Sequence, residues 1–336
     1  MVLVLSLSAM VYGGSLEPNA PPSSTMKTLD QVEPRTAITT VPITITQSGS
    51  YYLTKSFTAT RTAITVEANE VSIDLCGFTL TGPGGTEENF GVFMNGRKNV
   101  DIRNGTIKSF GYDGIRENNT TGGNHRITGI RSIGNGRDGI HINGSGHVIK
   151  DCIVRRNGIG AAGLVCGIFV HGLCTISGNC VSENGFVAED TFYGIYAGGH
   201  CTITGNMICG NGESANYVIG IYASSSTITG NCVNENGGWT DLQATGIQAD
   251  FGSVCSGNIV NSNGRESSGD VYGIKAGDAT TVTGNTVFNN GTTILGSGYG
   301  IYLWGHNLVD KNTSYFNGTN MNNPGNCVFG QNVGAP

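Results

Sequence analysis

The sequence predicts an all-β chain that winds into a single-stranded right-handed parallel β-helix, with about nine to ten coils and a cap at each end. Three observations predict it. A Gly-Ile pair, a segment of the type Thr-Ile-Thr-Gly-Asn and an Asn-Gly pair each recur along the 336 residues and stay in phase with one another. Internal repeats of this length are typical of solenoids, in which a unit buries its apolar side only against its neighbours.

The Gly-Ile pair marks one position in every repeat. Successive pairs are 25 to 28 residues apart, and Gly91-Val92 lies 23 residues before the first. We expect their isoleucines to point inward and to stack as a ladder, each coil about 4.8 Å from the next. The ladder consists of Ile115, Ile140, Ile168, Ile195, Ile221, Ile247, Ile274 and Ile301. Left-handed β-helices have strict six-residue repeats, which these longer units do not fit.

Asparagines mark two further positions in each repeat. One series, expected to bond from coil to coil through its side-chain amides, is Asn179, Asn206, Asn231, Asn258, Asn285 and Asn312. The other, in which glycine follows each asparagine, is Asn135, Asn157, Asn184, Asn211, Asn236, Asn263, Asn290 and Asn317. Asparagine and glycine supply the left-handed backbone conformations of sharp corners. Between the corners, three short runs of alternating side chains in each unit predict three strands.

The chain divides into four predicted parts. Residues 1–14 are a signal-like segment, 15–45 a linker and N-terminal cap, 46–318 the β-helix, and 319–336 a C-terminal cap. The first segment is apolar and ends in small residues, which favours a secretory signal over an apolar strand and predicts a secreted, periplasmic or cell-surface protein. It is too short to cross a bilayer, so we expect no transmembrane segment. A net charge of −6 argues against a nucleic-acid partner.

The repeat units resemble the right-handed parallel β-helix superfamily of pectate-lyase-like proteins. Within it they are most similar to the NosD-like group and to carbohydrate-binding and sugar-hydrolase repeats. The segment from Ile64 to Thr81 also resembles the first coil of many bacterial secreted members, as does the segment from Ser48 to Thr54. The resemblance implies the fold, but the fold carries lyases, hydrolases, epimerases, adhesins and plain binding proteins.

Two neighbouring coils carry the candidate catalytic residues Asp113, Arg116, Asp138 and His141. The aspartates are 25 residues apart, so we expect them to lie one coil apart, with the arginine beside the histidine on the outer face. Two carboxylates about 5 Å apart shift one another's pKa and can act on a glycosidic bond. Alternatively, they could bind calcium, as the resemblance to pectate lyases implies. Arginine could neutralise a uronate carboxylate, and histidine could act as general acid or base. The simpler interpretation is that Asp-Gly is ordinary turn chemistry and outer charges are merely solvated.

Further residues are candidates for binding substrate. The cations Arg137, Arg155 and His171 suit an acidic polysaccharide, and the outward aromatic residues Phe169, Tyr196, Tyr222 and Tyr302 suit sugar rings. Aromatic residues also stabilise any sheet by stacking, so both roles stay open. Longer segments at 186–193, 213–219, 238–245, 265–272 and 292–299 share one corner and are expected to form a wall beside this face. Strand parity places Glu117 inward, where it could pair with an arginine or mark a bulge.

The ten cysteines are predicted to be buried free thiols. Cys174 and Cys201 are expected to stack, and so are Cys152 and Cys180, because their spacing matches the repeat. A coil spacing of about 4.8 Å exceeds the Cβ separation of about 3.8 Å in a disulfide. The sequence has no cysteine and histidine spacing typical of zinc sites, so no metal ligand is assigned, and calcium is the one cofactor considered.

The favoured function is a secreted carbohydrate-active protein, a polysaccharide lyase or glycoside hydrolase that acts on an acidic polysaccharide. The alternative is a non-catalytic surface or structural β-helix that binds glycan or protein partners. An enzyme requires the four charged residues to converge, whereas a binding module requires only the aromatic face. Whether the chain is an enzyme, and its oligomeric state, stay open at this point.

Overall fold

The computed structural model describes residues 33–159, 163–186, 191–240, 242–291, 297–322 and 324–334. The signal-like segment at 1–14 and the first part of the predicted linker lie outside the described residues. Residues Thr36–Pro336 form one compact unit. Among the described residues no helix is long and apolar enough to cross a membrane.

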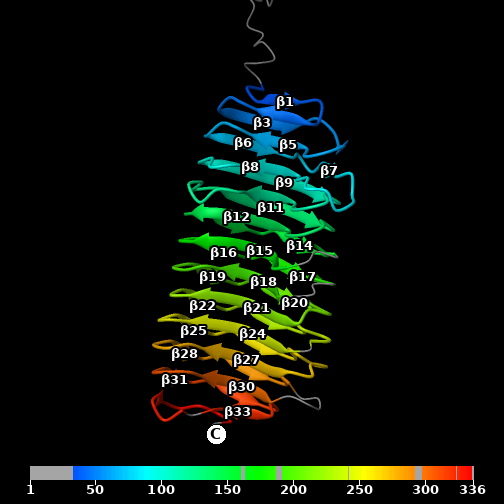
Figure 1. The fold of residues 1–336 in the computed structure, drawn as a ribbon. Coiled ribbons are helices and arrows are strands. Elements are labelled where there is room, and N and C mark those ends of the chain that lie inside the picture. Colours follow the sequence, from blue (N-terminus) through cyan, green and yellow to red (C-terminus); the bar gives the residue numbers. More distant parts are fainter. Residues whose placement is uncertain are drawn as a thin grey trace, which may run out of the picture. The chain divides into compact units, whose positions relative to one another are not determined.

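The unit is a stack of short parallel strands in two sheets (Figure 1). One sheet, here called the Gly-Ile sheet, holds 12 strands. They are β2 (Ile43–Ile45), β5 (Ile64–Val66), β8 (Val92–Met94), β10 (Ile115–Glu117), β12 (Ile140–Ser145), β15 (Val165–Gly172), β18 (Thr191–Ala197), β21 (Tyr217–Ser224), β24 (Gln243–Asp250), β27 (Asp270–Ala276), β30 (Gly298–Leu303) and β33 (Thr319–Met321).

The other sheet holds 22 strands, usually two from each coil. They are β1 (Thr36–Ile38), β3 (Gly49–Leu53), β4 (Phe57–Thr58), β6 (Val71–Asp74), β7 (Thr79–Thr81), β9 (Val100–Lys108), β11 (Arg126–Ile133), β13 (Val148–Lys150), β14 (Ile153–Arg155), β16 (Thr175–Ser177), β17 (Cys180–Ser182), β19 (Thr202–Thr204), β20 (Met207–Cys209), β22 (Thr227–Thr229), β23 (Cys232–Asn234), β25 (Val254–Ser256), β26 (Ile259–Asn261), β28 (Thr281–Thr283), β29 (Thr286–Phe288), β31 (Leu308–Asp310), β32 (Thr313–Tyr315) and β34 (Val328–Phe329). The prediction of an all-β parallel solenoid is confirmed.

The isoleucine ladder forms the core, as predicted. Each isoleucine of the Gly-Ile pairs lies in register with the next, for example Ile195 with Ile221, and all are fully buried. The glycine before each isoleucine is required by close packing. A Cβ added at Gly194 would lie 2.5 Å from the carbonyl oxygen of Gly220 and 2.7 Å from a methyl group of Ile208. Glycine therefore lets the coils approach to hydrogen-bonding distance at this position of the strand.

Both asparagine series form buried hydrogen-bonded ladders. In the first, the Asn206 Oδ1 atom accepts hydrogen bonds from the backbone N and the Nδ2 of Asn179, both at 2.9 Å. In the second, the Asn236 Oδ1 atom accepts from the backbone N of Asn211 at 3.2 Å and from its Nδ2 at 2.9 Å. These amides satisfy the corner backbone groups, which would otherwise be buried without partners.

The cysteines follow the predictions with two corrections. The prediction of burial is wrong for half of them, since Cys76 is exposed and four others are half-buried, namely Cys180, Cys209, Cys232 and Cys327. All ten are free thiols, and the Cys174 backbone N donates to the Sγ of Cys201 at 3.4 Å, so this pair stacks as expected. The prediction that Cys152 stacks on Cys180 is wrong by one residue. Cys180 is half-buried and pairs with Ile153, while the Cys152 backbone N donates to Asn179 Oδ1 at 2.9 Å. Cys152 therefore occupies a position in the asparagine ladder, which sets the register of this coil.

The stack extends beyond the predicted boundaries at both ends. At the start, β1 pairs with β3 and β2 with β5, so paired strands begin inside the predicted N-terminal cap. At the end, β33 pairs with β30 and β34 with β31, inside the predicted C-terminal cap. Both caps therefore use the same parallel pairing as the coils between them.

The predicted wall segments are in part strand. Their final residues begin β18, β21, β24, β27 and β30 and lengthen the Gly-Ile sheet, whereas residues 187–190, 241 and 292–296 lie outside the described residues. Four fully buried side chains under this extension form a second small core: Val165, Phe192, Ala215 and Val218. The segments therefore widen the sheet with their final residues, while their other described residues are turns and loops.

Candidate active site

The structure brings the four predicted catalytic residues together at one point of the Gly-Ile sheet. β10 and β12 pair in parallel with Ile115 opposite Ile140 and Arg116 opposite His141. The aspartates precede the two Gly-Ile pairs and lie one above the other, since Asp113 Oδ1 accepts a hydrogen bond from the Asp138 backbone N at 2.9 Å. Below, Asp113, Arg116, Asp138 and His141 are called the His141 cluster.

The two carboxylates of the cluster are buried and fully engaged. Both aspartates are 0% exposed. The second Asp113 oxygen accepts from the Arg116 Nη1 atom at 3.0 Å. Asp138 Oδ1 accepts from the Cys166 backbone N at 2.7 Å, and its Oδ2 lies 2.5 Å from His141 Nδ1. Each carboxylate therefore ties its own coil to the next one and presents no oxygen to solvent.

The cluster shifts the proton affinities of its members. Burial, together with the facing Asp138 carboxylate, raises the pKa of Asp113 to about 8, against the lowering effect of Arg116. The raised pKa of Asp113 reflects the cost of burying two carboxylates in contact with each other. Burial also lowers the pKa of His141 below 6.5, although the hydrogen bond to Asp138 opposes this shift. His141 is consequently a neutral imidazole at neutral pH.

The contact with Asp138 fixes how this imidazole is protonated. A carboxylate 2.5 Å from Nδ1 selects the tautomer with the proton on Nδ1. The lone pair then sits on Nε2, for which the described residues provide no hydrogen-bond partner. The ring stacks on Phe169, with centroids 4.2 Å apart and planes 12° apart. Asp138 and Phe169 thus fix the orientation of the ring, which is 8% exposed, and leave Nε2 as its basic nitrogen.

Two arginines flank the cluster. The Nε and Nη2 atoms of Arg116 donate to Asn118 Oδ1 at 3.2 and 3.0 Å, so the guanidinium is clamped between this amide and Asp113. The Arg137 guanidinium lies over the Tyr112 ring at 5.0 Å and donates to its hydroxyl and to the Leu164 carbonyl oxygen. Arg116 is the cation that adjoins His141 directly, whereas Arg137 is held back by its own partners.

The cluster does not fit calcium, which the sequence left open as an alternative. One ligand atom from each of Asp113, Asp138 and His141 lies within 4.8 Å of the others. Calcium takes six to eight oxygen ligands, and this set offers two carboxylates and one nitrogen. The carboxylate oxygens already accept hydrogen bonds, and a guanidinium lies 3.0 Å from one of them. Replacing these bonds with bonds to calcium would place the ion against the Arg116 charge.

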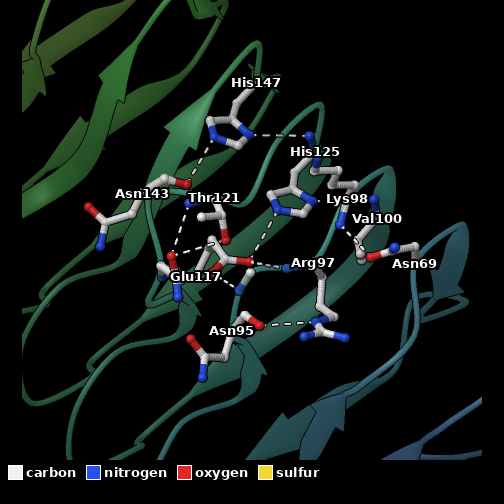
Figure 2. Close-up of polar contacts among 12 residues, drawn as sticks. Asn69, Asn95, Arg97, Lys98, Val100, Glu117, Thr121, His125, Asn143 and His147 are labelled. Carbon is white, nitrogen blue, oxygen red and sulfur yellow. Dashed lines mark hydrogen bonds and ion pairs between the residues drawn. The ribbon is translucent and has the colours of Figure 1, made fainter.

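Glu117 points inward, as parity predicts, but its surroundings match neither the expected ion pair with an arginine nor the expected bulge (Figure 2). Its oxygens accept from the backbone N atoms of Gly96, Arg97 and Asn119 at 2.7, 3.1 and 2.8 Å, and one lies 3.4 Å from His125 Nε2. Burial raises the pKa of Glu117, but the hydrogen bonds from His125 and the backbone amides outweigh it and lower the pKa. Glu117 therefore anchors the turn after β10. Arg97 contacts it through its backbone amide alone.

A continuous outward ladder leads away from the cluster on the same face. His141, Phe169, Tyr196 and Tyr222 occupy one register position in consecutive coils. Their rings stack, with centroids 4.9 Å apart between Phe169 and Tyr196 and 5.0 Å apart between Tyr196 and Tyr222. The same register position continues through Gln248 and Lys275 to Tyr302. The predicted aromatic residues thus form one surface with the candidate base.

Hollows flank the His141 cluster on this surface. One of about 480 Å³ is lined by Phe169, the exposed His171, Leu173 and Tyr196. Another of about 360 Å³ is lined by Phe93, whose register partner is Arg116. Corner residues such as Leu173 bound the hollows, in place of the predicted wall segments. The cluster therefore lies between two depressions along one face.

Not every predicted residue belongs to this face. Arg155 lies on β14 in the other sheet, where it forms an ion pair with Glu183, so it does not join the cluster. The sequence prediction also missed Asn118, which lies in a turn and carries no pattern signal. It missed Trp304 as well, although parity places Trp304 on the same side as Tyr302.

Comparison with known proteins supports the architecture. No protein-family model and no curated protein sequence matches this chain. Among solved structures, it is similar to the A-module of the mannuronan C-5 epimerase AlgE6 from Azotobacter vinelandii, with 14% identity and a TM-score of 0.53 over 86% of this chain and 91% of the module. It is also similar to the Dettilon tailspike protein, with 16% identity and a TM-score of 0.54 over 79% of this chain.

At such low identity the likeness concerns the fold. The chain spans 55% of the tailspike protein, so that similarity covers just over half of its length. Both similar structures are right-handed parallel β-helices, and the ladder registers described above have the same parallel stacking. The chain is therefore a right-handed parallel β-helix protein.

Proposed function

We propose that this chain acts on an acidic polysaccharide by removing the proton beside the carboxylate of a uronate residue, with His141 as general base. The observation that carries the proposal is the contact of 2.5 Å between His141 Nδ1 and Asp138 Oδ2. It leaves Nε2 as the basic atom of a side chain that is 8% exposed and occupies an outward register position. A neutral imidazole held by a buried carboxylate is a common arrangement for proton abstraction.

The remaining cluster residues suit this step. When Nε2 takes the C5 proton, the electron pair moves into the substrate carboxylate, where negative charge accumulates. Arg116 lies in register beside His141 and can pair with that carboxylate. Hydrogen bonds to Asn118 and Asp113 hold the Arg116 guanidinium in place beside His141. Expulsion of the C4 oxygen, which takes a proton from water as it leaves, then completes a lyase reaction, and return of a proton from water to the opposite face of C5 would complete an epimerisation.

The geometry favours this chemistry over hydrolysis. Glycosidases use two carboxyl groups that reach the glycosidic bond from its two sides. Asp113 and Asp138 are 0% exposed, and their oxygens are engaged with Arg116, His141 and backbone amides.

We also propose that the protein is exported, as the apolar start of the sequence predicts, because acidic polysaccharides of cell walls and matrices lie outside the cell.

A polysaccharide screen tests the proposal. Polygalacturonate, alginate and other uronate polymers are incubated with the protein, and absorbance near 235 nm reports the unsaturated product of elimination while proton NMR reports inverted C5 centres. We expect one polymer to react, and His141→Ala to reduce its rate at least about a hundredfold, the usual contribution of a general base.

His306 provides the matched control. Its Nδ1 lies 3.2 Å from Asp278 Oδ1, but the pair is exposed and lies off the stacked aromatic ladder. His306→Ala is expected to retain full activity. Equal activity in the two variants would contradict the role of His141. Binding without any reaction would instead support the alternative, a glycan-binding module.

A further inference from the structure

A second aromatic hollow lies on the Gly-Ile sheet far from the His141 cluster. It measures about 370 Å³ and is lined by Gln248, Asp250, Phe251, Lys275, Tyr302 and Trp304, together called the distal pocket. The register ladder places Tyr302 six coil steps from His141. At about 4.8 Å per coil, the distance is about 29 Å along the stack.

The distal pocket exposes large aromatic side chains. Trp304 is 63% exposed and Phe251 60% exposed, although burial would be favourable for both. Tyr302 is held edge-on against Tyr272 and Tyr299, with centroids 5.0 and 5.1 Å away. Gly277 lines the hollow, and a Cβ there would lie 2.8 Å from an Asp250 oxygen. Two exposed rings thus border a depression in which Gly277 lies close against Asp250.

The polar groups of the pocket are suited to hydroxyl and carboxylate groups. The Lys275 ammonium lies 5.0 Å from the centre of the Tyr272 ring and supplies a cation. Gln248 Nε2 donates to Asp250 Oδ2 at 3.0 Å, which orients an amide and a carboxylate beside the exposed rings. Apolar faces combined with a few oriented polar groups are what a pyranose ring requires, because its C–H face stacks and its rim forms hydrogen bonds.

We infer that the distal pocket is a saccharide-binding subsite for a sugar residue of the same acidic polysaccharide on which His141 acts. The inference rests on the proposed function and extends it. The ladder between the two sites offers Phe169, Tyr196 and Tyr222 as a continuous track. The protein therefore prefers polymers long enough to span both sites, and it binds shorter chains at one site only.

Calorimetric binding to size-fractionated uronate chains tests the inference. The background is His141→Ala, so that turnover does not consume the ligand, and the probes are alginate and polygalacturonate as trisaccharides and as polymers. Adding Trp304→Ala is expected to weaken polymer binding about tenfold, as loss of one stacking contact implies. Trisaccharide binding at the His141 site is expected to stay unchanged.

Trp239→Ala is the matched control, because Trp239 is also 63% exposed and lies in the segment between β23 and β24. It is expected to leave polymer binding unchanged, and thermal melts verify that each variant is folded. The distal subsite would be overturned if the two tryptophan variants bound polymer with equal affinity. It would also be overturned if the His141→Ala protein with both tryptophans bound no polymer. Polymer binding that depends on Trp304 in a protein without activity would uphold the subsite and reject the proposed function.

Discussion

His147 is a buried histidine whose neutral form the fold requires. Its Nδ1 accepts a hydrogen bond from the His125 backbone N at 3.2 Å, and its Nε2 donates to the Asn143 carbonyl oxygen at 3.1 Å. Its ring stacks on His125 at 5.0 Å (Figure 2). Burial, with a smaller contribution from His125, lowers the pKa of His147 from 6.5 to about 4. A proton on Nδ1 would remove the acceptor that the His125 amide uses.

The depressed pKa of His147 predicts a loss of stability in acid. A group with a lowered pKa stabilises the fold fully above its unfolded value of 6.5, and this stabilisation is lost as pH falls toward the folded value of about 4. The loss amounts to about 3 kcal/mol. Asn307 accepts the amide of the preceding coil at the equivalent corner, so His147→Asn keeps the acceptor without the titration.

Urea unfolding at pH 7 and pH 4.5 measures this effect. We expect the variant to lose less stability than the parent between the two pH values. Other titrating groups, Glu117 and Asp113 among them, contribute equally to both proteins and cancel in the comparison. Identical pH dependence of unfolding in the two proteins would show that His147 does not carry the proton linkage.

At the scale of the element, the corners depend on the asparagine ladders. The Asn236 side chain accepts two hydrogen bonds from Asn211, and its Nδ2 donates to Asn263 Oδ1 and to the carbonyl oxygens of Ile208 and Asn234. Asn236→Ala leaves these buried partners unsatisfied, so we expect it to destabilise the protein by about 2–4 kcal/mol. Asn234 on β23 is half-buried, and Asn234→Ala is expected to cost less than about 1 kcal/mol.

Chemical denaturation together with native-state hydrogen exchange checks this prediction. In a solenoid the coils next to the altered one lose protection first, because each coil contacts only its neighbours. The account would be contradicted if Asn236→Ala and Asn234→Ala unfolded at the same urea concentration.

The strands show which registers the repeat spacing predicts correctly and which it does not. The recurrence of Gly-Ile pairs at intervals of 25 to 28 residues was sufficient to predict that Ile195 stacks on Ile221, because parallel strands stack in fixed register. The same counting misplaced Cys152 by one residue, since a coil can shift the length of a corner without changing the overall repeat. Hydrogen bonds of the asparagine ladder decide that register, and they are visible only in the structure.

For the whole molecule, the sequence predicted the His141 cluster because Arg116 and His141 occupy the same register position in neighbouring coils. Asp113 and Asp138 are likewise one coil apart. The sequence prediction failed for Arg155, because strand parity distinguishes inside from outside but does not say which outer face a residue occupies. It also did not predict that Asp113 and Asp138 are buried, which depends on the packing of neighbouring coils. Trp304 could have been predicted, since it lies two residues after the outward-facing Tyr302, directly beyond the end of β30.

The proposed polysaccharide face combines these scales. The strand register aligns the outward side chains in a ladder. Corner residues such as Leu173 and Phe251 line the hollows beside the ladder, and Asp138 orients the His141 imidazole within it. The central claim is that His141 Nε2 removes the proton beside a uronate carboxylate. That claim does not depend on whether the reaction ends in elimination or in inversion.

Exchange with heavy water tests the claim most directly. The protein is incubated with a reactive uronate polymer in deuterium oxide, and NMR follows the C5 proton of recovered polymer and product. The account predicts deuterium at C5 of epimerised residues, or loss of the C5 proton in unsaturated ends, with the parent and with His306→Ala but not with His141→Ala. Loss of the C5 proton at an unchanged rate in His141→Ala would contradict it.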